Sequence, residues 1–176
     1  MVEMEIPIEE ILAVKRPDEL EIEPPMKAKI LAVEVEPREV KNSKGQTVTV
    51  PYLVFRVRRL ATKQDDGTWR ETIASKPFGL YYKVSKRKDS KYGKLIEALW
   101  EVAEDIMKNA KTLKDLEGAI FVFENKEVRL GNIISRVWLP VELVGIEPVS
   151  EEEKEMLKRD EEIENKAEEL AREVLG

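Results

Sequence analysis

The sequence contains no cysteine and no histidine among its 176 residues. Their absence excludes disulfide bonds, thiolate nucleophiles, zinc sites of the Cys/His kind and serine triads that need an imidazole base. Carboxylate–metal chemistry and a lysine nucleophile stay open. However, the chain has no Asp-x-Asp pair, and Asp65-Asp66 precedes Gly67 in a turn-like context. The composition favours a binding protein over an enzyme, and we expect no catalytic residue, metal or cofactor.

Long apolar runs are also missing. No stretch of 18 or more apolar residues is present, and the acidic N-terminal segment lacks the basic-then-apolar order of a signal peptide. We therefore expect a cytoplasmic protein without a membrane span. Glutamine is reduced to Gln46 and Gln64, whereas charged residues make up 38% of the chain. This bias is typical of heat-stable proteins from hyperthermophiles, although long charged helices would also raise the count.

Charge is distributed unevenly along a chain whose formal net charge is −6. Residues 1–25 carry 2 basic and 8 acidic side chains, and residues 150–176 carry 5 and 11. Residues 26–99 reverse this balance with 17 basic and 8 acidic side chains. Every aromatic residue lies within 52–138. Basic groups and flat rings therefore share one region, as a surface for single-stranded nucleic acid requires, although a barrel core would also use aromatic rings.

The pattern of apolar residues predicts one α+β domain that is mainly β. An acidic arm (1–25) ends at Glu-Pro-Pro, a barrel domain follows (26–149), and an acidic helix closes the chain (150–176). The predicted strands are 26–35, 48–60, 69–75, 119–124 and 132–143, with a helix over 91–109 between the third and fourth strands. The order β-β-β-α-β-β is that of a five-stranded OB-type barrel. An open sheet with one helix on its face is the alternative.

The two helices carry apolar stripes. Ser90 is placed to cap the first, and its expected buried stripe is Leu95, Ile96, Leu99, Val102, Ala103 and Ile106. The C-terminal helix has a thinner seam of Met156, Ile163, Ala167, Leu170 and Val174. That helix could pack on the barrel, pair with a second copy in a homodimer, or stay largely solvated.

Alternation along the second and third strands selects candidate ligand contacts. Leu53, Phe55 and Val57 suit the barrel interior, which places Tyr52, Arg56 and Arg58 on the outer face. By the same alternation, Arg70 is a candidate on the third strand. Trp69 beside it lies next to a turn, where it could cover a ligand or cap the barrel.

The segment after the third strand interleaves rings with cations, which suits stacked bases and phosphates. Its candidates are Tyr81, Tyr82, Lys83, Lys86, Arg87 and Lys88. On the fifth strand the expected buried set is Ile133, Val137, Leu139, Val141 and Leu143, which leaves Arg136 and Trp138 on the other face. Trp138 would then be covered by a base or by the C-terminal helix.

Three segments, 91–99 (KYGKLIEAL), 113–118 (LKDLEG) and 137–141 (VWLPV), resemble small OB-fold single-stranded DNA-binding proteins of phages and of archaeal viruses or plasmids. The resemblance covers about residues 26–145 and rests on element order and spacing. It implies strand protection in replication or recombination. Bacterial proteins of that functional class end in a flexible acidic tail with a short apolar motif, whereas this chain ends in a predicted helix.

The sequence therefore predicts a largely sequence-independent binder of single-stranded DNA, with RNA as a close variant. The competing hypothesis is a protein-interaction module that acts through its C-terminal helix.

Overall fold

A computed structural model describes residues 23–72, 76–159 and 170. Its strands are β1 (Met26–Lys41), β2 (Thr47–Lys63), β3 (Trp69–Glu71), β4 (Phe78–Lys83), β5 (Ala119–Leu130) and β6 (Ile133–Ile146). Its helices are α2 (Lys91–Val102), α3 (Glu104–Asn109), the 3₁₀ turn η1 (Leu113–Leu116) and a helix over 151–159. No helix within this part of the chain is long and apolar enough to cross a membrane.

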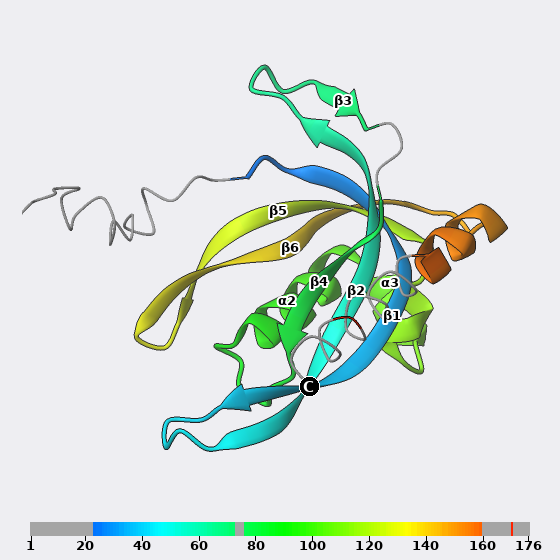
Figure 1. The fold of residues 1–176 in the computed structure, drawn as a ribbon. Helices are drawn as coiled ribbons and strands as arrows, with labels where there is room; N and C mark the ends of the chain where they lie inside the picture. Colours follow the sequence, from blue (N-terminus) through cyan, green and yellow to red (C-terminus); the bar gives the residue numbers. More distant parts are fainter. Residues whose placement is uncertain (1–22, 73–75, 160–169, 171–176) are drawn as a thin grey trace, which may run out of the picture.

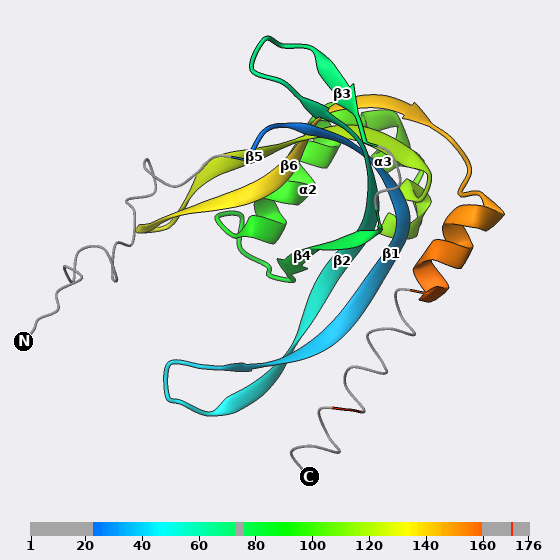
Figure 2. The same ribbon diagram turned by 45° about the horizontal axis from the view of Figure 1, so that its top comes forward.

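The fold is mainly β, as predicted, and its strands form one antiparallel sheet (Figure 1). The strand order is β3-β2-β1-β5-β6, and β4 pairs with β2 beside β3. The sheet has six strands rather than five, because residues 78–83, which we expected to be a link, form β4. The sheet curves strongly (Figure 2) but is open between β4 and β6, which do not pair in the described residues.

The curvature has a cause in irregular pairing of β1 with β2 and of β5 with β6. The β1–β2 register shifts between Lys27 and Ala28 and again between Ile30 and Ala32, and the β5–β6 register shifts twice near Phe121. An extra residue in one strand of an antiparallel pair bends that strand and increases its twist. These irregularities lie close to where β1 pairs with β5, so they bend the sheet around its core.

Helix α2 packs against the curved sheet. Ser90 caps it as predicted, since its hydroxyl accepts a hydrogen bond from the Gly93 N–H at 2.9 Å. The predicted stripe is confirmed: Leu95, Leu99 and Ala103 are buried, and Ile96, Val102 and Ile106 pack partly buried against the core. The predicted continuous helix bends at Ala103 into α2 and α3. The Ala103 N–H still donates to the Leu99 carbonyl, so the hydrogen bonding runs on through the bend.

Strand alternation predicted most of the core correctly. Leu53, Phe55 and Val57 are buried as expected, and so are Val137 and Leu139, whereas Val141 and Leu143 are half-buried. The prediction for Ile133 is wrong, because this residue begins β6 at the tip of a hairpin, beyond the core, and is 67% exposed.

The β1–β2 and β5–β6 hairpins project from the body of the molecule, and so does the β2–β3 hairpin at the top of both views (Figures 1 and 2). We call residues 36–52 the β1–β2 arm and residues 124–138 the β5–β6 arm. In the β1–β2 arm, Pro37 pairs with Pro51. The Pro51 carbonyl accepts a hydrogen bond from the Val84 N–H at 3.0 Å, so it points away from β1. In an antiparallel ladder the nitrogen and the carbonyl of a residue point to the same side, so the nitrogens of Pro37 and Pro51 both face away from the partner strand. Neither nitrogen carries a hydrogen, so neither can donate to a further strand.

The C-terminal helix begins on the sheet. Ser150 and Glu153 form a reciprocal capping box, with hydrogen bonds of 3.0 and 3.1 Å. The Glu153 carboxylate also accepts a hydrogen bond from Lys29 of β1 at 2.8 Å, and both residues are only 3% exposed. Of the three predicted alternatives, packing on the sheet therefore holds for residues 151–159. Leu170 is exposed, and the seam residues Ile163, Ala167 and Val174 lie outside the described part, as do residues 1–22 of the predicted arm.

Candidate nucleic-acid interface

Four predicted contact residues come together on the outer face of β2 and β4. The register pairs Tyr52 with Lys83, Val54 with Tyr81 and Arg56 with Gly79. Residues two apart on a strand share a face, and directly paired residues do too. Tyr52, Arg56, Tyr81 and Lys83 therefore line one surface, which we call the stacking face. Tyr81 is 36% exposed, and Lys83 is also exposed.

Arg38 belongs to the same surface and was missed by the sequence analysis. Its guanidinium lies over the Tyr81 ring at 4.3 Å and over the Tyr52 ring at 5.8 Å. It was missed because the first strand was expected to end at Val35, whereas β1 continues to Lys41. Residues 34, 36 and 38 share one face of the strand. Because Glu34 was already placed in the strand, this alternation was the signal that could have identified Arg38.

Arg56 lies on the predicted face, but other side chains of the protein already engage its guanidinium. It is only 6% exposed, and it pairs with Glu36 at 2.8 Å and with Glu34 at 3.4 Å. Its guanidinium also donates to the Tyr81 hydroxyl at 3.4 Å. The prediction that Arg56 binds phosphate is corrected, because two carboxylates from β1 already neutralise it. Its role in the structure is to hold Tyr81 and β1 in place.

Gly79 allows the Tyr81 ring to lie flat on the sheet. A Cβ atom at position 79 would come within 2.7 Å of that ring. An aromatic side chain that covers a glycine in this way is a recurring arrangement in β-sheets. The glycine that looked like part of a link in the sequence is therefore a packing site for Tyr81.

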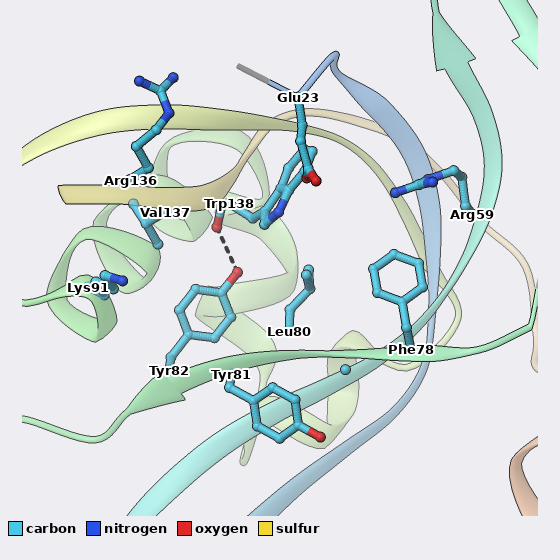
Figure 3. A pocket seen from close by; sticks show the side chains of 11 residues that line it. Glu23, Arg59, Phe78, Leu80, Tyr81, Tyr82, Lys91, Arg136, Val137 and Trp138 are labelled. Carbon is cyan, nitrogen blue, oxygen red and sulfur yellow. Dashed lines mark hydrogen bonds between the residues drawn. The ribbon is translucent and has the colours of Figure 1, made fainter. Parts of the chain in front are cut away.

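A pocket opens where β4 and β6 separate, and we call it the seam pocket (Figure 3). Its volume is about 370 Å³. Leu80, Tyr82 and Val137 form an apolar floor, and the rings of Phe78 and Trp138 stand beside it. Arg59, Lys91 and Arg136 supply positive charge, Glu23 supplies one carboxylate, and Gly79 and Tyr81 complete the lining.

Tyr82 is a core residue, which corrects its prediction as a ligand contact. It is 1% exposed, its ring packs edge-on against Phe55, and its hydroxyl donates to the Trp138 carbonyl at 2.6 Å. Burial raises the pKa of its hydroxyl far above the ordinary value. This hydrogen bond connects β4 to β6 across the opening, so Tyr82 ties the seam together.

Arg136 and Trp138 lie at the seam pocket, as half-buried residues on β6. The Arg136 guanidinium donates to the side chain and to the backbone carbonyl of Asn125, each at 2.8 Å. Trp138 packs partly buried against the core, and the Glu23 side chain lines the same pocket (Figure 3). The C-terminal helix was expected to be one possible cover for Trp138, but its described residues do not line this pocket.

The loop between β4 and α2 carries three predicted basic residues, Lys86, Arg87 and Lys88, and all three are exposed. In both views this loop lies between the two arms (Figures 1 and 2). Arg87 forms an ion pair with Asp89 at 3.1 Å, and both side chains lie within 4 Å of a Cβ built at Gly131, at the tip of the β5–β6 arm. Together with Lys83, the loop forms a basic rim beside the stacking face.

Three predicted residues lie elsewhere. Arg58 lies beside the C-terminal helix, with its Nε 3.3 Å from the Glu153 carboxylate. Trp69 and Arg70 belong to the β2–β3 hairpin, where Arg70 pairs with Thr62 at the opposite end of β2 from Tyr52. Lys27 lies over the Trp69 ring at 4.6 Å, at the end of the sheet where β2 pairs with β3.

No group of three acidic side chains in the described ranges is arranged to hold a metal ion. Comparison of the chain with protein-family models, with curated proteins and with solved structures finds no significant match.

Proposed function

We propose that the chain binds single-stranded DNA, largely independently of base sequence, through the stacking face and the basic rim. The proposal is carried by the convergence of Tyr52, Tyr81 and Arg38 on one outer face, with Lys83 beside them. Bases stack on aromatic rings and on guanidinium planes whatever their identity, because every base has a flat face. Because Arg38 covers the outer face of the Tyr81 ring, a base stacks on the guanidinium plane or takes its place on the ring, and Tyr52 supplies the second ring of the surface.

The basic rim supports the same ligand. Lys83 lies on the stacking face, and Lys86 and Lys88 follow it in the exposed loop after β4, so these lysines can meet phosphates while the bases lie on the rings. Each phosphate that is neutralised releases condensed counterions, which makes affinity depend on salt. The charge of this region opposes that of the acidic terminal segments, so the acidic net charge of the whole chain is no obstacle.

An OB-type fold is part of the proposal. β1 lies between β2 and β5, and a helix separates the third and fourth strands if β3 and β4 are counted as two pieces of one strand. OB-folds are partly open five-stranded barrels that bind oligonucleotides on strands two and three, between two hairpin loops. The stacking face lies on the equivalent strands, and the β1–β2 and β5–β6 arms take the places of the two loops. In the cell, such a protein would protect strands during replication or recombination.

The direct test is fluorescence anisotropy of a labelled thymidine oligonucleotide of about 15 nucleotides, near the upper site size of one OB-fold. We expect binding to the single strand, weaker binding to the duplex of the same length, and loss of affinity in Tyr81→Ala. Arg70→Gln is the control, because it removes an exposed cation far from the stacking face and should leave affinity unchanged.

Equal affinity for duplex and single strand, or equal effects of the two substitutions, would contradict the proposal. An RNA oligonucleotide measured alongside decides between the two nucleic acids. If no oligonucleotide binds, the alternative of a protein-interaction module acting through residues 150–176 replaces it.

A further inference from the structure

The seam pocket is adjacent to the stacking face across a single strand. Tyr81 and Tyr82 are successive residues of β4, so their side chains point to opposite faces of the sheet (Figure 3). The stacking face lies on the Tyr81 side, and the seam pocket opens on the Tyr82 side. Among the described residues, β4 pairs with β2 alone. A nucleic-acid strand can therefore cross the free edge of β4 and reach both surfaces with neighbouring nucleotides.

The lining of the pocket combines three kinds of chemistry. Flat apolar walls come from Phe78 and Trp138, and cationic groups stand around them at Arg59, Lys91 and Arg136. Such a combination suits a planar base that is attached to a phosphate. Thymine, cytosine and the purines all satisfy these two requirements, so walls and cations alone give no preference among bases.

Glu23 supplies the third kind of chemistry. Its carboxylate and the Trp138 ring both line the pocket, and no hydrogen bond connects Glu23 to the other lining residues (Figure 3). An ionised carboxylate accepts hydrogen bonds but cannot donate them. Beside a stacked base it therefore favours an exocyclic amine, such as cytosine N4, and disfavours a carbonyl oxygen, such as thymine O4.

On the basis of the proposed function, we infer that the seam pocket is a subsite for one base of the bound strand and that Glu23 makes it prefer a base with an exocyclic amine. The base stacks on Trp138 and donates its amine to Glu23, while its phosphate lies near Arg136 or Lys91. The stacking face binds the neighbouring nucleotides without preference.

The test compares cytidine and thymidine oligonucleotides of equal length on the full chain. Thymine and cytosine have the same ring size but differ at C4, in the proton on N3 and in the C5 methyl group of thymine. A deoxyuridine oligonucleotide measured alongside removes the methyl difference. We expect the cytidine oligonucleotide to bind roughly tenfold more tightly, which is within the discrimination of one good base contact. Glu23→Gln should remove most of this preference, because a glutamine amide can also donate to thymine O4. Its affinity for thymidine should stay the same or rise, since a negative charge is lost.

Glu39→Gln is the matched control, since Glu39 is also an exposed acidic residue but lies in the β1–β2 arm, outside the pocket. It should leave the ratio of the two affinities unchanged. A second readout is fluorescence quenching of Trp138 in a Trp69→Phe, Trp100→Phe background, which leaves one tryptophan. The cytidine oligonucleotide should quench Trp138 more strongly than the thymidine oligonucleotide does at saturation.

The results separate the two proposals. If thymidine and cytidine oligonucleotides bind equally, or if the preference survives Glu23→Gln, the subsite is disproved while the stacking face stands. If neither oligonucleotide binds, both the proposed function and the subsite fail.

Discussion

Tyr81 and Tyr82 are neighbours on β4 with different environments: Tyr81 lies on the outer surface, and Tyr82 lies in the core. Replacing Tyr82 by alanine should destabilise the fold by about 3–5 kcal/mol, because it leaves a large cavity. Tyr82→Phe should cost about 1 kcal/mol, since only the hydrogen bond to the Trp138 carbonyl is lost. Tyr81→Ala should change stability far less and weaken oligonucleotide binding by about 1–3 kcal/mol. Chemical denaturation and anisotropy titrations of the three variants check this; a Tyr81→Ala variant as unstable as Tyr82→Ala would contradict it.

The buried pair of Lys29 and Glu153 gives a second residue-scale prediction. Glu153→Gln should destabilise the protein by up to about 3–5 kcal/mol, because the buried charge of Lys29 then keeps only the Pro148 carbonyl at 3.0 Å and the exposed Glu147 carboxylate at 3.8 Å. The double variant Lys29→Met, Glu153→Leu should recover much of this loss, since no charge is left buried. Denaturation midpoints of the two variants provide the measurement. Equal losses in both would mean that packing, rather than charge, matters at this contact.

The same carboxylate makes stability depend on pH. Burial alone would raise the pKa of Glu153, but hydrogen bonds from Lys29 and from the Ser150 N–H, with the charges of Lys29 and Arg58, hold it below the ordinary value of 4.5. A depressed pKa means that the stabilisation is complete above about pH 4.5 and declines as the pH falls through the folded-state value. Wild type should therefore lose more stability between pH 6 and pH 3 than the Lys29→Met, Glu153→Leu variant, measured by thermal unfolding.

At the scale of elements, Gly118 joins three strands. Its N–H donates to the Ile30 carbonyl at 2.7 Å, and its carbonyl accepts from the Glu147 N–H at 2.8 Å. Its φ is +93°, and a Cβ atom would come within 2.6 Å of the Glu147 carbonyl oxygen. Gly118→Ala should therefore lower the free energy of unfolding by more than the roughly 1–2 kcal/mol that a left-handed backbone conformation costs by itself.

Gly45→Ala is the matched control for that backbone effect. Gly45 has a similar φ of +76°, and a Cβ there meets nothing within 4 Å. The difference between the two variants in unfolding free energy measures the clash at the strand junction. Equal destabilisation would show that Gly118 is needed for its backbone angle only.

Strands and helices were predictable from the sequence where the pattern that defines them lies within a short segment of the chain. The alternation of Leu53, Phe55 and Val57, and the cap at Ser90, depend on residues close together in the chain. β4 was missed because Gly79 resembles a loop residue until the Tyr81 ring is placed over it.

Partners that are distant in sequence were not predictable. Arg56 looked like an exposed cation because Glu34 and Glu36, which neutralise it, belong to another strand. Lys29 and Glu153 are 124 residues apart. Alternation assigns a side chain to a face, but only the packed fold shows what already covers that face.

At the scale of the whole molecule, the charge segregation predicts how binding responds to salt. Each phosphate contact contributes a slope of about −0.7 in log K against log salt for a single strand. Contacts by Lys83, Lys86 and Lys88 should thus give a slope of about −2 or steeper. Anisotropy titrations at several salt concentrations supply the slope. A flat response would argue against phosphate contacts at the basic rim.

The acidic C-terminal segment should weaken this binding. Removal of residues 160–176 deletes seven acidic and two basic side chains but keeps Glu153 and its contacts. A chain that ends at Arg159 should therefore unfold at the same temperature as the full chain. It should bind the oligonucleotide more tightly at low salt, because a tethered segment competes at high effective concentration. The gain should shrink at high salt, and light scattering on both chains would detect any dimer that the removed residues support.

The paired prolines of the β1–β2 arm have a consequence for the protein when no ligand is bound. A two-stranded ribbon in solvent presents a row of backbone donors and acceptors on each margin, and such rows can template the stacking of further chains into fibrils. Pro37 and Pro51 remove one donor from each margin at the same level of the ribbon. On the β1 margin an incoming strand would meet a gap in its ladder at Pro37, and on the β2 margin the Pro51 carbonyl is already bonded to the Val84 N–H. The β1–β2 arm is therefore a projecting two-stranded ribbon whose margins offer a poor template for a further strand.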